Sequence, residues 1–333
     1  MALSESHKVP ISIDCVQALV TLALSAAALP AIAQETYPVK PVRLLVGFSP
    51  GGGQDIAARL LSKHLTTSWG QPVVVENRAG ANGIIAAEAV ANAPPDGYTL
   101  HLFTANDTVN AGVRAKMPYD TLRDLALVTT VASAPYLLGV HPALPAKNVR
   151  ELIALARTKP GQLSYASSGT GSPIHLSTAL FNLMAGVSTI HVPYKGSGPA
   201  LLDLVSGQLQ ISMASLGSFS QYVTSGRIRV LAVTGATRMA QLPMVPTVAE
   251  SGVPGYEATT WNGIAAPART SPAIIAALNR ELARLLALPE VKESFVRLGA
   301  EPRASTPEAF ANQIKAEMNK WSALVKSMGL QLE

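Results

Sequence analysis

Short apolar runs alternate with helical runs along most of this chain, and no other feature of the sequence restricts its fold as strongly. The first strand-like run covers residues 42–46, and a helical pattern follows at residues 56–65. Such alternation is typical of parallel sheets whose faces are covered by helices. The sequence therefore predicts an α/β protein. Further strands are predicted at residues 73–76, 99–103, 163–166, 189–192, 209–214 and 230–233, and further helices at residues 84–91, 149–157, 173–184 and 199–206.

A single sheet with this many strands would be unusually large, so we expect two lobes. The chain has 333 residues, of which 48% are hydrophobic, and this is enough for a sizeable buried core. The last part of the chain changes character, because Pro272, Pro289 and Pro307 each open an amphipathic helical run. Gly299 and Gly329 end the second and third of these runs.

The first 33 residues are typical of a secretory signal. Lys8 precedes an apolar run at residues 16–29, and the small residues Ala31 and Ala33 follow it. The run is about 14 residues long, whereas a membrane-spanning helix needs roughly 20. We therefore expect the protein to be exported and cut after Ala33, without a membrane anchor.

Charge and cysteine content argue against several classes of function. Cys15 is the only cysteine and lies in the signal, so the mature chain would have no disulfide and no thiolate metal site. Removing Lys8, Glu5 and Asp14 from totals of 26 basic and 21 acidic side chains leaves a formal charge of +6. No dense basic cluster occurs, and the histidines lack metal-site spacing. We expect no metal, no cofactor and no nucleic acid partner.

A glycine-rich turn at residues 49–55 joins the first strand to the first helix. Glycines let the backbone approach a ligand, and the helix start offers unpaired N–H groups and a positive dipole end, so this turn predicts an anion site. A nucleotide-binding loop needs Gly-Lys-Ser/Thr here, but the chain has Gly53-Gln54-Asp55. Ser49 matches the nucleophile pattern of serine hydrolases, yet Pro50 lacks the N–H that an oxyanion hole requires. Asp55 is expected to act as a helix-start charge or as a partner of Arg59.

Two more turns of this kind follow predicted strands. Residues 167–172 lead into a helix that begins at Pro173, and residues 194–198 lead into one at Pro199. Ligands of open α/β sheets bind at the carboxyl ends of strands, so the three turns together predict a crevice for an anion. His175 is expected either to face this crevice or to pack within its helix, and Lys195 is either a ligand cation or a solvated lysine.

Several motifs occur in order along the chain. They are Tyr37-Pro38-x-Lys40-Pro41-x-Arg43, Pro50-Gly51-Gly52-Gly53, Gly70-Gln71-Pro72-Val73-Val74-Val75-Glu76-Asn77-Arg78, Pro95-Asp96-Gly97-Tyr98-Thr99-Leu100, His191-Val192-Pro193-Tyr194-Lys195-Gly196, and Leu242-Pro243 with Pro246-Thr247. Together they resemble the Bug family, the periplasmic solute receptors related to the substrate-binding component of tripartite tricarboxylate transporters. The resemblance extends from Tyr37 to Glu333. Gln54 departs from the family's usual Thr or Ser, which leaves the ligand open.

The resemblance implies a monomeric, two-lobed Venus-flytrap receptor of the periplasm that closes on a small carboxylate and is not an enzyme. One lobe would combine residues 35–134 and 259–333, and the other would hold residues 135–258. Its partners would be transporter membrane subunits. Two alternative functions stay open: a ligand sensor that signals to a membrane partner, and an exported serine hydrolase that uses Ser49. The expected ligand-binding residues are Phe48, Ser49, Gly51, Gly52, Gly53, Gln54, Asp55, Thr104, Asn106, Gly169, Thr170, Gly171, Ser172, His175, Tyr194, Lys195, Gly196, Ser197, Trp261 and Asn262.

Overall fold

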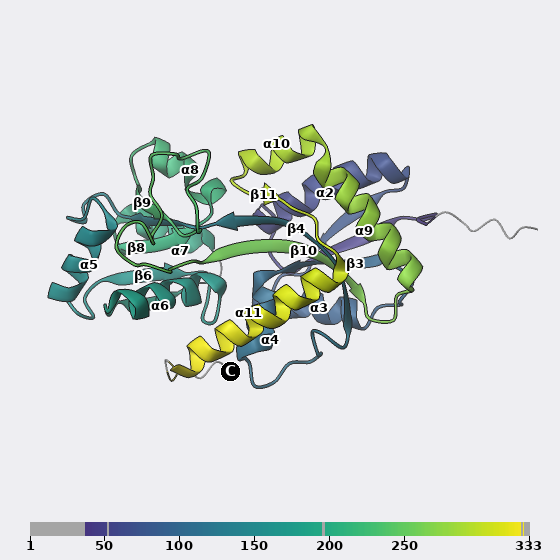
Figure 1. Ribbon diagram of the computed structural model, residues 1–333, viewed down its shortest axis with the longest axis horizontal. Coiled ribbons are helices and arrows are strands. Elements are labelled where there is room, and N and C mark those ends of the chain that lie inside the picture. Colours follow the sequence, from purple (N-terminus) through teal and green to yellow (C-terminus); the bar gives the residue numbers. More distant parts are fainter. Residues whose placement is uncertain (1–36, 52, 195–196, 328, 330–333) are drawn as a thin grey trace, which may run out of the picture. The chain divides into compact units, whose positions relative to one another are not determined.

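Two β-sheets with helices on both faces make up the described part of the chain (Figure 1), which confirms the α/β prediction. The computed structural model describes residues 37–51, 53–194, 197–327 and 329, so the predicted signal segment lies outside the described residues. In these described ranges, no helix combines the length and the apolar character needed to cross a bilayer.

The first sheet has six strands and is built from both ends of the described chain. Its strand order is β11 (Glu301–Pro302), β4 (Leu125–Pro135), β10 (Thr259–Pro267), β3 (Thr99–Thr104), β1 (Val42–Val46) and β2 (Val73–Asn77). Apolar side chains of α2 (Gly53–Trp69), α9 (Pro272–Ala287) and α10 (Pro289–Arg297) join one core cluster with the sheet. Those of α3 (Ile84–Ala91) and α11 (Pro307–Ser327) join another.

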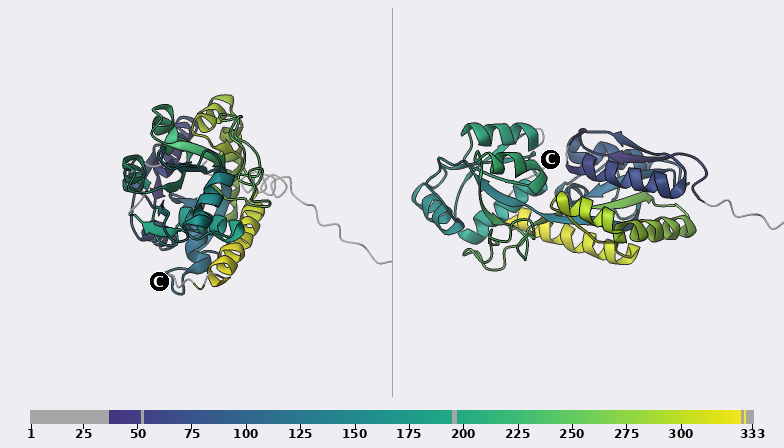
Figure 2. Two further views of the ribbon diagram at one scale, coloured as in Figure 1. Left: turned by 90° about the vertical axis from the view of Figure 1, so that its left-hand side faces the viewer. Right: turned by 90° about the horizontal axis from the view of Figure 1, so that it is seen from above.

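The second sheet has five strands, all from the middle of the chain. Its order is β7 (Ile190–Pro193), β6 (Ser164–Ser167), β8 (Ile211–Ala214), β5 (Leu137–Val140) and β9 (Arg229–Val233). Helices α5 (Val149–Thr158) and α6 (Pro173–Ala185) contribute to one core cluster. Helices α7 (Ser197–Ser206) and α8 (Leu216–Thr224) contribute to another, and Figure 2 shows these layers from two further directions.

Both sheets also contain antiparallel pairs, and these involve strands that the sequence analysis did not identify. Strand β10 is antiparallel to both β3 and β4, and β5 is antiparallel to both β8 and β9. Strand β10 contains Gly263 and two consecutive alanines, so its side chains carry little strand signal. Strand β4 is buried along much of its length and does not show a clean alternation of apolar and polar residues.

The chain passes between the sheets at the carboxyl ends of their parallel strands. Pro135 ends β4, and it pairs with Thr259 at the start of β10. Leu137 starts β5, and it pairs with Ala214 and Val233, the last residues of β8 and β9. The turns that follow β1, β6 and β7 lie at these carboxyl edges, as the sequence predicted.

Thr234 connects the two segments that pass between the sheets. These crossing segments are Tyr136, between β4 and β5, and residues 234–258, between β9 and β10. The Thr234 hydroxyl accepts a hydrogen bond from the Tyr136 N–H at 2.7 Å and lies 2.6 Å from the carbonyl oxygen of Ala258, to which it donates. Its backbone completes the arrangement, since Thr234 N–H donates to Tyr136 and Ala258 N–H donates to Thr234, both at 2.9 Å. Thr234 is fully buried, so these groups have no solvent to replace a lost partner.

Besides the two crossing segments, three helices connect the elements of the two sheets. Helix α4 (Ala105–Val113), which follows β3, shares a small apolar cluster with α6 and α11. Val109, Leu176 and Trp321 are its most buried members from the three helices. The C-terminal helix therefore contacts elements attached to both sheets.

Replacing Thr234 with valine should destabilise the fold by ~1–3 kcal/mol, because the shape is kept while the Tyr136 N–H and the Ala258 carbonyl lose a buried partner. Urea unfolding followed by circular dichroism would measure the loss. Thr224→Val is the matched control: its hydroxyl donates to Ser220 at an exposed helix site, so a change below about 0.5 kcal/mol is expected. Equal losses in the two variants would contradict this role of Thr234.

Candidate functional site

Asp55 organises the glycine-rich turn after β1. One carboxylate oxygen accepts from the Gly51 N–H and from Arg59 Nε, both at 2.9 Å, and the other accepts from Asn77 Nδ2 at 2.9 Å. Burial would raise the pKa of Asp55, but the hydrogen bonds from Arg59, Gly51 and Asn77 outweigh it and hold the pKa below its usual value. The predicted pairing with Arg59 is therefore observed, and both oxygens are occupied by groups of the protein itself.

The start of the turn is held by a close approach of two glycines. A Cβ atom on Gly47 would lie 2.6 Å from the Cα atom of Gly83, which belongs to the short helix η1 (Ala81–Gly83). The ring of Phe48 packs against Gly83, and the Phe48 carbonyl accepts from Asn77 Nδ2 at 3.0 Å. Phe48 therefore supports the turn from the side of the sheet.

Two free backbone donors of this turn are at the start of α2. Among the described residues, the N–H groups of Gly53 and Gln54 have no protein acceptor, as expected for the first turn of a helix. Ser49 and Gly53 are exposed, and Gln54 is half-buried. The Gly51 N–H is already used by Asp55, and Gly52 lies outside the described residues.

A second cluster of hydrogen-bonded polar side chains lies at the carboxyl end of β3. Asp107 accepts from the Thr104 N–H at 2.7 Å and from its hydroxyl at 2.8 Å, and it also contacts His101 Nε2 at 3.0 Å. These bonds fix the start of α4. Asn106 Nδ2 donates to Asn82 Oδ1 at 2.6 Å, which connects α4 to η1.

The two predicted site residues of β10 lie in different surroundings. Asn262 is half-buried and pairs in the sheet with Thr104, at the same edge as the turns. Trp261 is only 3% exposed; it stacks with Phe103 and donates its indole N–H to Glu317 at 2.9 Å. Trp261 is thus a core residue in this structure, where the sequence analysis expected it to line the cleft.

Ser167 organises the turn after β6. Its hydroxyl lies 3.0 Å from the Gly169 carbonyl oxygen, 3.1 Å from the Gly169 nitrogen and 2.7 Å from His191 Nε2. The Gly171 N–H donates to His175 Nδ1 at 3.0 Å, and the Ser172 N–H donates to the Gly169 carbonyl at 3.1 Å. Three predicted ligand donors, at Gly169, Gly171 and Ser172, are therefore engaged within the turn.

The free backbone donors of this turn lie beside the engaged ones. Within the described part of the chain, no protein acceptor pairs with the N–H groups of Ser168 and Thr170. Ser168 and Gly169 are half-buried and Thr170 is exposed. The sequence analysis predicted this segment as part of the site, but it could not separate the free donors from their engaged neighbours, because the separation depends on side chains that fold back onto the turn.

His175 and His191 stack beneath this turn. Their ring centroids are 3.8 Å apart with an interplanar angle of 6°, and His175 is 4% exposed. Burial lowers the pKa of His175 to about 4, with a further contribution from the neighbouring His191. Burial likewise lowers the pKa of His191 to about 4. Both rings are neutral near pH 7, and of the two alternatives for His175, packing is the one observed.

The turn after β7 is described only in part, since Lys195 and Gly196 lie outside the described residues. Tyr194 donates its hydroxyl to Asp203 at 2.5 Å, and burial together with this carboxylate raises the pKa of Tyr194 to about 12. Ser197 begins α7.

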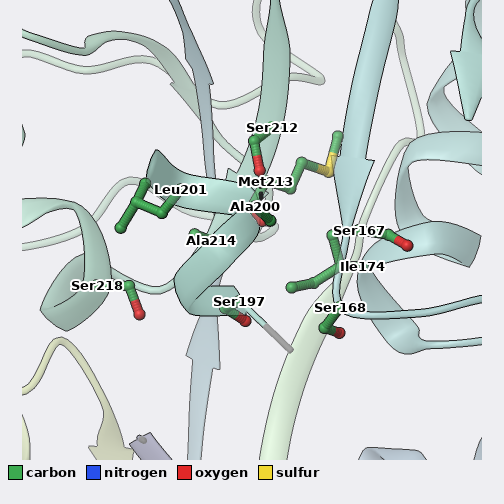
Figure 3. Close-up of a pocket in the computed structure, with 10 residues that line it drawn as sticks. All are labelled: Ser167, Ser168, Ile174, Ser197, Ala200, Leu201, Ser212, Met213, Ala214 and Ser218. Carbon is green, nitrogen blue, oxygen red and sulfur yellow. Dashed lines mark hydrogen bonds between the residues drawn. The ribbon is translucent and has the colours of Figure 1, made fainter. Parts of the chain in front are cut away.

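A small cavity lies at the carboxyl edge of the second sheet (Figure 3), and several of its lining residues were not predicted. Ser215 caps α8 by accepting from the Ser218 N–H, so residues 214–218 form a further strand-to-helix turn. Its small and hydroxyl residues are the signal that would have identified it. All the lining residues are uncharged: Ser167, Ser168, Ile174, Ser197, Ala200, Leu201, Ser212, Met213, Ala214 and Ser218.

No group of three or more potential metal ligands occurs within the ranges that the structure describes. Ser49, the nucleophile of the hydrolase alternative, has no hydrogen bond to a histidine in those ranges, and Pro50 follows it. The arrangement consists of neutral donors: backbone N–H groups and hydroxyls at helix starts, with acidic groups such as Asp55 and Asp203 already paired. Such donors suit hydrogen bonding to an anion.

Comparison with known proteins identifies similar chains over nearly the whole described range. The family model for the tripartite tricarboxylate transporter family receptor matches residues 57–330. BugT of Bordetella pertussis is 38% identical over 304 residues, which cover 91% of this chain and 93% of BugT.

Solved structures agree with these sequence matches. An R. palustris protein with adipate is 39% identical with a TM-score of 0.84, and the match covers 89% of this chain and 99% of the other. MatC from Rhodopseudomonas palustris with bound malate is 30% identical with a TM-score of 0.79, and that match covers 87% of this chain and 100% of MatC.

The neutral histidine pair predicts a loss of stability in mild acid. Because the folded-state pKa values of about 4 lie below the ordinary value of 6.5, the unfolded chain binds more protons between these limits. The free energy of unfolding should therefore fall as the pH decreases from about 6.5 to 4, by at most about 1.4 kcal/mol per pH unit for each histidine. Urea unfolding at several pH values would measure this slope, which should be smaller in His175→Asn; equal slopes would contradict the assignment.

Proposed function

Because this chain belongs to the tripartite tricarboxylate transporter receptor family, we propose that it captures a small carboxylate between its two lobes and delivers it to a transporter of that type. The resemblance to the Bug receptors is confirmed by the same matches. The family is one of solute-binding receptors, and we propose no catalytic role for Ser49.

The observation that carries this proposal is the position of the free backbone donors. Gly53 and Gln54 offer N–H groups at the start of α2 on the first sheet, and Ser168 and Thr170 offer them on the second. Both sets follow the carboxyl ends of parallel strands, and the chain passes between the sheets at those same edges. A carboxylate has up to four acceptor positions, so it can take donors from both sides at once.

A doubly charged carboxylate fits this arrangement best. Helix starts carry a partial positive charge, and hydrogen bonds from N–H groups to a carboxylate are stronger than neutral ones. The relatives solved with adipate and with malate each hold a dicarboxylate. The uncharged residues around Ser168 would contact the aliphatic part of such a ligand. Gln54 reaches further than the Thr or Ser usual in the family, so it would limit the length of ligand that fits.

We further propose that residues 35–134 with 259–333 form one lobe and residues 135–258 the other. The two crossing segments support this division, because β4 ends at Pro135 and β10 begins at Thr259. Closure would turn the lobes about these segments while Thr234 keeps them together. Ligand binding then stabilises the closed state, since donors of both lobes reach the carboxylate only there.

The proposed place of action is the periplasm, reached by a signal cut after Ala33. Protein recovered from the periplasm of a host cell should then begin at Gln34, which N-terminal sequencing would establish. A first residue elsewhere would move the cleavage site, and retention of Met1 in the exported protein would contradict a cleavable signal.

Transporter subunits are the proposed partner of the loaded receptor. Loss of uptake of the bound carboxylate in cells that lack this protein would support delivery to a transporter. Normal uptake, with loss of a transcriptional response to the same compound, would support the membrane-sensor alternative instead.

Gly53 permits a sharp test of the donor arrangement. Gly53→Pro removes one N–H from the first position of α2, where proline is well tolerated, and nothing lies within 4 Å of a Cβ at this position. The dissociation constant for adipate, measured by titration calorimetry, should rise about 10- to 100-fold, as expected for the loss of a hydrogen bond to a charged group.

Gly53→Ala is the matched control, because it adds a Cβ and keeps the N–H. Its affinity should stay within about threefold of the wild type. Equal affinities in the proline and alanine variants would contradict the role of this donor. Failure of the wild-type protein to bind adipate, malate and a wider panel of mono-, di- and tricarboxylates would contradict the proposed function.

A further inference from the structure

We propose that the stacked rings of His175 and His191 are positioning residues of the turn at residues 167–172, and that they determine which of its backbone N–H groups face the ligand. The expected effect on ligand affinity rests on the proposed function. The effect on the shape of the turn does not. Neither histidine needs to touch the ligand.

His175 holds the turn from the helix side. The Gly171 N–H donates to His175 Nδ1 at 3.0 Å, so this nitrogen carries no proton and the ring proton is on Nε2. The backbone of the same residue is fixed by Ser172, whose hydroxyl accepts from the His175 N–H at 3.2 Å. The ring and the backbone of one residue thus fix two consecutive residues of the turn.

His191 holds the turn through Ser167. A serine hydroxyl donates one hydrogen bond and accepts two. If Ser167 donates to the Gly169 carbonyl and accepts from the Gly169 N–H, its remaining acceptor position pairs with a proton on His191 Nε2, 2.7 Å away. This assignment gives a partner to the Ser167 hydroxyl, the Gly169 N–H, the Gly169 carbonyl and His191 Nε2. It also places the proton of both neutral rings on Nε2.

The consequence for the ligand is a selection among neighbouring donors. Gly169 and Gly171 donate their N–H groups to Ser167 and His175. The N–H groups of Ser168 and Thr170 have no acceptor within the described residues, so they stay available to a ligand. His175 accepts from the Gly171 N–H directly, and His191 acts through Ser167, whose hydroxyl accepts from the Gly169 N–H. The geometry therefore points to the histidine pair as the cause of this alternation.

Protonation would disrupt this arrangement. A proton on His175 Nδ1 would face the Gly171 N–H, donor against donor, and a second positive ring would lie 3.8 Å from its neighbour. The titratable side chains that face the pair are each histidine for the other and Tyr165 of β6, whose ring centroid is 5.1 Å from that of His191. No carboxylate in the described structure is paired with either ring to compensate the charge.

Hydrogen exchange of the ligand-free exported protein tests the structural content directly. His175→Leu removes the acceptor at similar size, and peptides covering residues 167–172 should exchange about tenfold faster at pH 7. His175→Asn places an oxygen where Nδ1 stands, so it should restore most of the protection. His141→Leu is the matched control: His141 Nδ1 accepts from the Ala143 N–H at 3.2 Å at the opposite edge of the sheet, so residues 167–172 should exchange as in the wild type.

Calorimetric titration with adipate tests the consequence. At pH 7 the dissociation constant should be about tenfold higher in His175→Leu than in the wild type, and His175→Asn should recover most of the affinity. Between pH 7 and 4 the affinity of His175→Asn should fall less than that of the wild type, because its side chain does not titrate. Since adipate itself binds protons in this range, the two proteins are compared at each pH.

The outcomes separate this inference from the proposed function. Wild-type-like exchange and affinity in His175→Leu would overturn the positioning role while leaving the receptor function intact. Equal effects of His175→Leu and His175→Asn would also overturn it, because they would show that the ring volume matters and the acceptor does not. If no protein binds adipate, the proposed ligand is wrong, and the exchange measurements alone decide the role of His175.

Discussion

The two segments that carry the chain between the sheets are held together by the buried side chain of Thr234. Its hydroxyl and backbone bond to Tyr136 on one segment and to Ala258 on the other. These segments sit at the carboxyl ends of the parallel strands of both sheets, so the edges that carry the glycine-rich turns are brought to one region of the chain fold. The position of every proposed ligand donor depends on this connection, because each donor lies in a turn attached to one of those edges.

Each turn then uses some of its own donors to fix its shape and leaves others free. Asp55 takes the Gly51 N–H in the first turn, and Ser167 and His175 take those of Gly169 and Gly171 in the second. A free N–H group that lies next to an engaged one is already in position, so it needs no reorganisation when an anion binds. The internal hydrogen bonds are therefore part of the binding geometry, even though the residues that make them need not touch a ligand.

The two turns are supported by groups of different charge. In the first, the buried carboxylate of Asp55 remains ionised because Arg59, Asn77 and a backbone N–H donate to it. In the second, two imidazole rings stay neutral because burial disfavours their charged form. A neutral support adds no field at the ligand, whereas the ionised one is balanced by Arg59, so in both turns the helix starts remain the main attraction for an anion.

The sequence by itself determined the α/β class, the family, the positions of most strands and helices, and the three turns at strand ends. These features depend on local patterns: alternating periodicity, proline and glycine at helix boundaries, and motifs of a few residues. It did not reveal strands β4, β5 and β10, because buried strands without alternation resemble other apolar segments. Only the tertiary structure decided that Trp261 is a core residue, that Thr234 joins the crossing segments, and which N–H groups of the turns remain free. Those outcomes depend on partners far apart in the chain, such as Ser167 with His191 and Trp261 with Glu317, and no local pattern specifies such a pairing.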